Sequence, residues 1–157
     1  MPRGINDSGD IVGDFGLLRG GTFTDIDLDG GFVEASGINN AGQIAGTVGF
    51  FDPEIPEVDF IFGFVLDPGG QTTFLALGGS SGNFTQAFGI NDRSEVVGWT
   101  DGGLGAYLFS GNNVVPLDVP GTPYGINNTG QIVGTVFDDS GRHAIAHAQA
   151  PDFLRVG

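Results

Sequence analysis

One ten-residue motif occurs four times in the chain, and this repetition constrains the fold more than any other feature. The copies start at Gly4, Gly37, Gly89 and Gly125 and read GINDSGDIVG, GINNAGQIAG, GINDRSEVVG and GINNTGQIVG. Such self-similarity is the signature of a repeat architecture, in which each copy forms one small supersecondary unit. We therefore expect a single domain over residues 1–157, with repeats at about 1–34, 35–86, 87–122 and 123–157.

Each motif is typical of a β-hairpin. Two short apolar runs flank Asn-Asn or Asn-Asp followed by a turn glycine, and these residues tolerate the left-handed backbone that tight turns need. Ser94 replaces the turn glycine in the third copy, so we expect that turn to be the most strained. The glycines that open and close each motif stand inside strands, where glycine usually marks close approach of another backbone.

Two further strand-like runs follow each hairpin. They are 17–19 and 22–28, 60–66 and 72–77, 106–109 and 114–118, and 143–147 and 153–156. Four antiparallel strands per repeat predict an all-β fold, most simply a four-bladed β-propeller, in which blades packed face to face cover both faces of each sheet. A linear β-repeat stack or a β-sandwich is the alternative.

Composition excludes several classes of function. The chain has 30 Gly, 14 Phe and no Cys, so tight turns are frequent and no disulfide is available. Its formal net charge is −14, with five arginines and no lysine, and such a surface repels phosphate backbones and anionic lipid headgroups. We expect no nucleic-acid partner and no membrane insertion, because no apolar run reaches the roughly 20 residues of a membrane helix.

The motif also resembles a known family. The decapeptide, the turn Asp118-Val119-Pro120-Gly121 and looser matches at His143-Ala144-Ile145 and Gly63-Phe64-Val65 are similar to the bacterial HAF extracellular repeats, over nearly the whole chain. Such repeats often occur in proteins with a PEP-CTERM sorting tail. The resemblance implies an extracellular or cell-surface location and no established enzymatic activity. Because Met1-Pro2-Arg3 leads straight into the first repeat, we expect no signal peptide within this chain.

The segment Asp25-Ile26-Asp27-Leu28-Asp29-Gly30 matches the first half of an EF-hand calcium loop. The bidentate acid that completes such a loop would fall at Ser36, which cannot supply it. The repeat register also aligns Leu28-Asp29-Gly30 with Val119-Pro120-Gly121, an outer-strand turn. We therefore interpret the segment as a structural turn and predict no metal site and no cofactor, with weak calcium binding as the alternative.

The sequence singles out no catalytic residue. His143 and His147 are the only histidines, and on one strand they would lie ~13 Å apart, too far to share a metal ion. There is no cysteine nucleophile, no serine stands near a histidine and an acid in the repeat, and no carboxylate pair is distinguished. Glycosylation sequons begin at Asn6, Asn83 and Asn127, but two of these are hairpin turns. We predict that the protein is not an enzyme.

Self-association is favoured by outer strands that lack the usual protection of exposed sheet edges. Residues 72–77 carry no charge, 114–115 and 154–156 are lightly protected, and the insertion at 49–59 mixes apolar and acidic residues. We therefore predict an extracellular structural protein that stacks into filaments or a matrix, with the charge of −14 opposing association. The alternative is a monomeric binding module that recognises a glycan or protein on one face.

Overall fold

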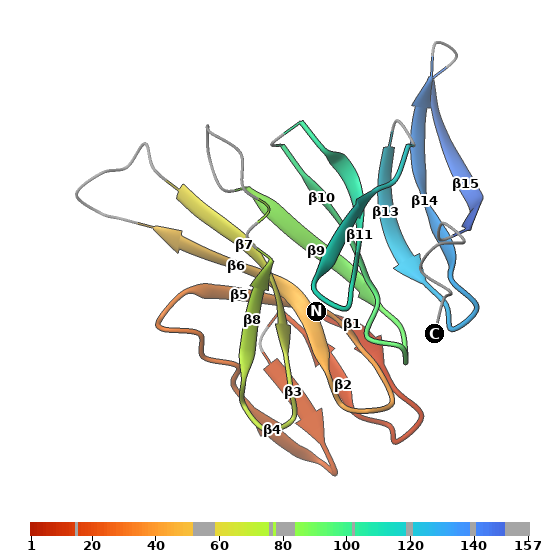
Figure 1. Cartoon of the computed structure of the whole chain (residues 1–157). Coiled ribbons are helices and arrows are strands. Elements are labelled where there is room, and N and C mark those ends of the chain that lie inside the picture. The colour runs from red at the N-terminus through yellow and green to blue at the C-terminus, as the bar shows by residue number, and fades with distance from the viewer. Residues whose placement is uncertain are drawn as a thin grey trace.

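The computed structural model describes residues 1–14, 16–51, 59–75, 77, 84–101, 103–118, 121–138 and 141–149. Every regular element within these residues is a β-strand, and the strands form four antiparallel sheets (Figure 1). The predicted all-β fold and the sheet-forming repeat are therefore confirmed. We call the four sheets units 1 to 4.

Each unit is a meander in which consecutive strands are neighbours. Unit 1 contains β1 (Pro2–Ile5), β2 (Ile11–Gly13), β3 (Gly16–Arg19) and β4 (Thr22–Thr24). Unit 2 contains β5 (Phe32–Ile38), β6 (Ile44–Phe51), β7 (Asp59–Leu66) and β8 (Thr72–Leu75). Unit 3 contains β9 (Thr85–Ile90), β10 (Val96–Thr100), β11 (Gly105–Ser110) and β12 (Asn113–Pro116). Unit 4 contains β13 (Gly121–Ile126), β14 (Gln131–Asp138) and β15 (Gly141–Gln149), and the further strand expected at 153–156 lies outside the described residues.

The decapeptides form the first hairpin of every unit, as predicted. Within each hairpin the register shifts by one residue just before or beside the opening glycine, which marks a β-bulge. The turn residue adopts a left-handed backbone in all four copies, including Ser94 with φ of 59°. A residue with a side chain adopts this left-handed backbone at a higher conformational energy than glycine does. The turn of unit 3 is therefore the most strained one, as expected.

The units pack face to face, and the core lies between them rather than within them. One apolar cluster fills the boundary between units 1 and 2, a second that between units 2 and 3, and a third that between units 3 and 4. The opening glycines permit this packing. A Cβ on Gly4 would lie 3.0 Å from Cα of Gly37, and one on Gly89 would lie 2.9 Å from Cα of Gly125.

The four sheets fan out in chain order, with β1–β4 at one end of the row and β13–β15 at the other (Figure 1). The first strands of the units follow one another, because β1 packs against β5, β5 against β9, and β9 against β13. The described strands display an open row of sheets and no closed ring. Closure into a four-bladed propeller therefore stays a prediction.

Candidate interaction surface

Each decapeptide turn is organised by the asparagine at its third position: Asn6, Asn39, Asn91 and Asn127. In every copy the side-chain Oδ1 accepts a hydrogen bond from the backbone N–H four residues later, at 2.9 or 3.0 Å. In units 1, 3 and 4 the N–H two residues later donates to the same oxygen. Because one side-chain oxygen gathers these donors, the turn is closed locally and the amide is held in one orientation.

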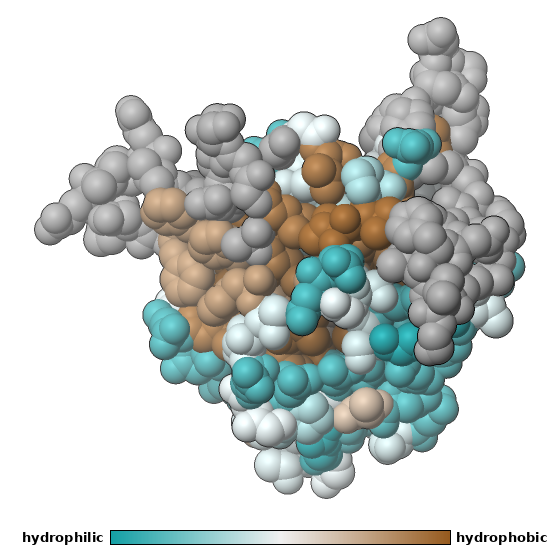
Figure 2. Space-filling view, in the orientation of Figure 1, coloured by the Kyte–Doolittle hydropathy of each residue, from teal (hydrophilic) through white to brown (hydrophobic). Residues whose placement is uncertain are grey.

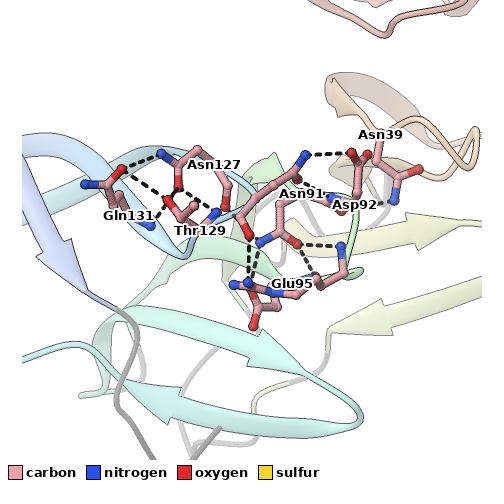
Figure 3. Close-up of polar contacts among 9 residues, drawn as sticks. Asn39, Asn91, Asp92, Glu95, Asn127, Thr129 and Gln131 are labelled. Atoms are coloured by element: carbon pink, nitrogen blue, oxygen red, sulfur yellow. Dashed lines mark hydrogen bonds and ion pairs between the residues drawn. The ribbon is translucent and has the colours of Figure 1, made fainter. Parts of the chain in front are cut away.

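The nitrogen of the same amide joins neighbouring units. Nδ2 of Asn6 donates to the carbonyl of Asn39 at 3.2 Å, and Nδ2 of Asn39 donates to the carbonyl of Asn91 at 3.1 Å. Nδ2 of Asn91 in turn donates to the carbonyl of Asn127 at 3.0 Å. Figure 3 shows the end of this series, with Asn127 of unit 4 beside Asn91 of unit 3. The four turns are thereby connected in chain order.

The fourth motif position alternates between acid and amide: Asp7, Asn40, Asp92 and Asn128. At each boundary the backbone N–H of the fourth-position residue donates to the side-chain Oδ1 of the fourth-position residue in the next unit, at 2.8 Å in all three cases. Nδ2 of Asn40 also donates to Asp7 at 2.8 Å and to Asp92 at 3.0 Å, and Nδ2 of Asn128 donates to Asp92 at 2.6 Å. We call these inter-unit hydrogen bonds of the third and fourth motif positions the ladder.

Alternation keeps like charges apart in the ladder. Two adjacent carboxylates would repel, whereas a carboxylate between two amides accepts hydrogen bonds from both sides. The pKa of Asp92 is accordingly lowered, first by the backbone N–H of Asn40 and then by the side-chain amides of Asn128 and Asn40. The ladder therefore favours the ionised form of Asp92 without an opposing charge.

The seventh motif position alternates in the same way: Asp10, Gln43, Glu95 and Gln131. Asp10 and Glu95 are buried carboxylates, and each is paired with an arginine of its own unit. Arg19 lies 2.8 Å from Asp10, and Arg93 lies 2.6 Å from Glu95. Buried carboxylates need such partners because desolvation disfavours their charge. Both alternating positions give the row a period of two units.

The apolar faces of the units follow the repeat as closely as the ladder does. We call the face that packs on the preceding unit the upstream face, and the opposite one the downstream face. Ile38, one residue after the opening glycine of unit 2, is 7% exposed on its upstream face, whereas the equivalent Ile5 of unit 1 is 67% exposed. Val12 is 1% exposed on the downstream face of unit 1, whereas the equivalent Val133 of unit 4 is 49% exposed. Among the described residues, no sheet precedes unit 1 or follows unit 4, so these two end faces are apolar and exposed.

The upstream face of unit 1 is also hollowed. Ile5, Ile11, Leu18 and Phe23 form one row across its four strands, because they are successive register partners. A hollow of about 330 Å³ beside this row is lined by apolar groups that include Met1 and the last three of these residues. The row corresponds to Ile38, Ile44 and Leu66 in unit 2, which pack in the cluster shared with unit 1.

The candidate calcium segment forms a turn, as interpreted from the sequence. Oδ1 of Asp27 accepts a hydrogen bond from the N–H of Gly30 at 3.0 Å, and Leu28 is buried in the boundary with unit 2. Strand β4 consequently ends at Thr24, which corrects the strand expected over 22–28. Within the described ranges, no three His, Cys, Asp or Glu side chains are grouped so that they could hold a metal ion.

The remaining candidates are placed only in part. The backbones of His143 and His147 lie on β15, with His143 opposite Val136, as the strand prediction requires. The sequon asparagines Asn6 and Asn127 both serve in turns and in the ladder. Asn83 and most of the insertion at 49–59 lie outside the described residues, which include only its ends in β6 and β7.

The ladder was not among the sites predicted from the sequence, although the sequence contains a signal for it. Aligning the four decapeptides shows the alternation Asp7, Asn40, Asp92, Asn128 directly. This alternation predicts inter-unit hydrogen bonds only if the turns are known to stack in chain order, because turn chemistry involves residues of one unit alone.

Comparison with known proteins adds no relative to this description. No family model, no curated protein and no solved structure matches the chain. The part of the chain that the structure describes has no helix long and apolar enough to cross a membrane. Function is therefore inferred from the residues and geometry of this chain itself.

Proposed function

We propose that this protein is an extracellular, non-catalytic structural protein that self-associates. The observation that carries the proposal is the exposure of end-face side chains whose described equivalents are buried or partly buried at the internal boundaries. Ile5, Phe23 and Val133 are each about half exposed or more. Contiguous exposed apolar surface of this kind marks an interaction site in a soluble protein.

The extracellular location rests on the resemblance of the decapeptides to HAF repeats. We further propose that the units are blades of a propeller-type assembly, because each is a meander whose first strand packs on the first strand of its neighbour. The four-bladed form requires that the downstream face of unit 4 meet the upstream face of unit 1 in the same chain. That closure would bury Val133 against Ile5 without a second molecule.

Charge sets the conditions under which association is expected. A formal net charge of −14 makes copies repel one another at low ionic strength. Salt shortens the range of this repulsion to about 8 Å at physiological ionic strength, while the apolar contact is not weakened by salt. Association should therefore strengthen with ionic strength, opposite to the trend of a contact held by ion pairs.

Sedimentation velocity and electron microscopy of the purified protein test the proposal. We expect ordered oligomers or fibres that grow with protein and salt concentration. A particle that stays monomeric at all concentrations, in high salt and with added calcium, would overturn it.

A binding module is the second candidate, and an aromatic patch on unit 2 favours it. Phe60 and Phe62 are stacked, with ring centroids 6.3 Å apart and planes at 7°. Phe74 meets Phe62 edge-on at 6.2 Å, and both Phe60 and Phe74 are exposed. Figure 2 shows apolar surface over β7 and β8 in this region. Exposed aromatic rings are a common platform for sugars and for protein hot spots.

The two candidates respond to different substitutions. Replacing Phe60 and Phe74 by alanine should abolish binding of a glycan or protein ligand and leave any self-association in place. Binding to a glycan array by a monomer, lost in this double variant, would support the module and contradict the structural protein.

A further inference from the structure

The two end faces are the two halves of one interface that the molecule already builds three times. At each internal boundary the downstream face of one unit, with Val12, Ala45 or Val97 at its centre, packs near the upstream isoleucine of the next unit. Val133 is the equivalent of these three residues on unit 4, and Ile5 is the equivalent of that isoleucine on unit 1. One half is thus exposed at each end of the row.

Gly125 indicates that unit 4 is built to receive another unit. The opening glycines Gly4, Gly37 and Gly89 each face backbone of the following unit, within 3.4 Å of an added Cβ. A Cβ on Gly125 would meet only Val133 of its own unit, at 3.2 Å. Among the described residues, no backbone of another unit lies within 4 Å of that Cβ. Position 125 is nevertheless a glycine, which is the residue that close packing of a following unit requires.

The ladder points to the identity of the following unit. Asn128 ends the alternation on an amide, and one of its two Nδ2 hydrogens is used by Asp92. Nδ2 of Asn127 donates one hydrogen to Oε1 of Gln131. Asn39 and Asn91 donate their second Nδ2 hydrogen to the carbonyl of the equivalent asparagine in the next unit, and the second hydrogen of Asn127 is available for the same role. A unit that begins with an acid at the fourth position would continue the series. Asp7 of unit 1 is such an acid.

Unit 1 offers the matching acceptors. The carbonyl of Asn6 stands where those of Asn39, Asn91 and Asn127 accept the amide of the preceding unit. Oδ2 of Asp7 accepts a hydrogen bond from Asn40, whereas Oδ1 of Asp7 has no donor among the described residues and can accept one from the N–H of a preceding unit. The seventh position also continues its alternation, from Gln131 to Asp10.

We propose that a second copy of this chain docks head-to-tail, with its unit 1 on the downstream face of unit 4, so that ladder and apolar core run on across the contact. This inference rests on the self-association proposed above and specifies its surface, orientation and register. The interface is heterologous, so it propagates as a filament or closes as a ring of copies. Each copy contributes one upstream and one downstream face.

One internal contact is not reproduced between copies. Oγ1 of Thr47 accepts a hydrogen bond from the N–H of Ala87 across the boundary of units 2 and 3. The equivalent pair at the new contact is Thr135 and Pro2, and proline has no N–H. Pro123 stands at the same position in unit 4, and the boundary of units 3 and 4 forms nonetheless. This hydrogen bond is therefore not essential to the interface.

Complementation of two charged variants tests the orientation. Ile5→Asp disables the upstream end face and Val133→Asp disables the downstream one, and each alone should weaken association about 100-fold or more, because the carboxylate would be buried unpaired. Mixing the two should restore one contact and give dimers only, since every larger assembly needs a disabled face. Leu104→Asp, at an exposed apolar position outside both faces, is the matched control and should assemble like the wild type.

Cross-linking tests which molecules meet. The chain has no cysteine, so Ser8→Cys and Thr129→Cys, placed on the turns of units 1 and 4, can be joined by a short bis-maleimide. We expect covalent dimers when the two single variants are mixed, and none from either alone. Self-linking of one single variant would show a head-to-head or tail-to-tail contact and overturn the proposal. A double variant that links only within one chain would show four-unit closure and also overturn it.

The outcomes separate this inference from the proposed function. If the wild type never associates, the self-associating function fails together with the inference. If it associates while Ile5→Asp and Val133→Asp leave assembly unchanged, the function stands and the head-to-tail contact is wrong.

Discussion

The boundary between units 3 and 4 and the two ends of the row are built from the same repeat positions, yet they differ in what covers them. Val97 is fully buried at the boundary, and its equivalent Val133 is half exposed at the end. Gly89 has backbone in front of it, and Gly125 has none among the described residues. The comparison teaches that each unit carries the complete surface of the repeat, whether or not the chain supplies a neighbour for it.

The largest expected contrast comes from placing the same charge at both valine positions. Val97→Asp would bury a carboxylate with no partner in the third apolar cluster, and should cost at least about 4 kcal/mol of unfolding free energy or prevent folding. Val133→Asp should change the unfolding free energy of the monomer by less than about 1 kcal/mol, because its side chain reaches water. Urea denaturation of both variants at low protein concentration measures the difference. Equal losses would show that the end face is covered within the single chain.

Local features of the fold could be predicted from the sequence. The decapeptide hairpins, the left-handed turn at Ser94 and the turn at Asp27 follow from turn chemistry, which involves only residues close in the chain. The meander that follows each hairpin was also predictable, because short apolar runs alternate with turn residues. These elements need no knowledge of how the units are placed relative to one another.

The relation between units could not be derived in the same way. The angle at each boundary depends on the volumes of the side chains that pack in one cluster there, such as Val12 of unit 1 and Phe64 of unit 2, and these are far apart in sequence. An open row and a closed ring use the same hairpins and the same alternating faces. The ladder was missed for a related reason, since Asp7 and Asn40 acquire a common role only when their turns are adjacent in space.

Alanine at the opening glycines gives the second contrast. In Gly89→Ala the new Cβ would lie 2.9 Å from backbone of unit 4, and the overpacking should cost about 1–3 kcal/mol of unfolding free energy. In Gly125→Ala the Cβ would meet only the end of the Val133 side chain, so the monomer should lose less than about 1 kcal/mol. Thermal unfolding compares the two monomers. A larger loss for Gly125→Ala would contradict an open downstream face.

Removing single ladder amides should give a smaller contrast. Asn39→Ala removes the turn bond to Gln43 and the inter-unit donor to the carbonyl of Asn91, which keeps only the N–H of Ser94. The loss should cost about 1–2 kcal/mol of unfolding free energy. Asn127→Ala removes only bonds within its own turn, because no following unit accepts its amide among the described residues. Its monomer should therefore be less affected, while its assembly should weaken. Chemical denaturation measures the first effect and sedimentation velocity the second.

The smallest effect concerns the charge of Asp92. Its folded pKa lies below the ordinary value of 3.8, because the backbone N–H of Asn40 and the amides of Asn128 and Asn40 donate to the carboxylate. A lowered folded pKa means that the unfolded state binds the proton more readily. The resulting stabilisation is present above pH 3.8 and is lost as the pH falls through the folded pKa.

Asp92→Asn removes this dependence and leaves an amide that can still accept a hydrogen bond. We expect the wild type to be more stable than the variant at neutral pH, with the difference shrinking as the pH falls below 3.8. Asp29→Asn, at an exposed turn outside the ladder, corrects for the loss of one negative charge from a chain of net charge −14. Unfolding free energies of the three proteins across this pH range decide the matter. A corrected difference that stays constant, or grows in acid, would mean that the ladder does not favour the ionised carboxylate, and that its alternation serves only to space the charges.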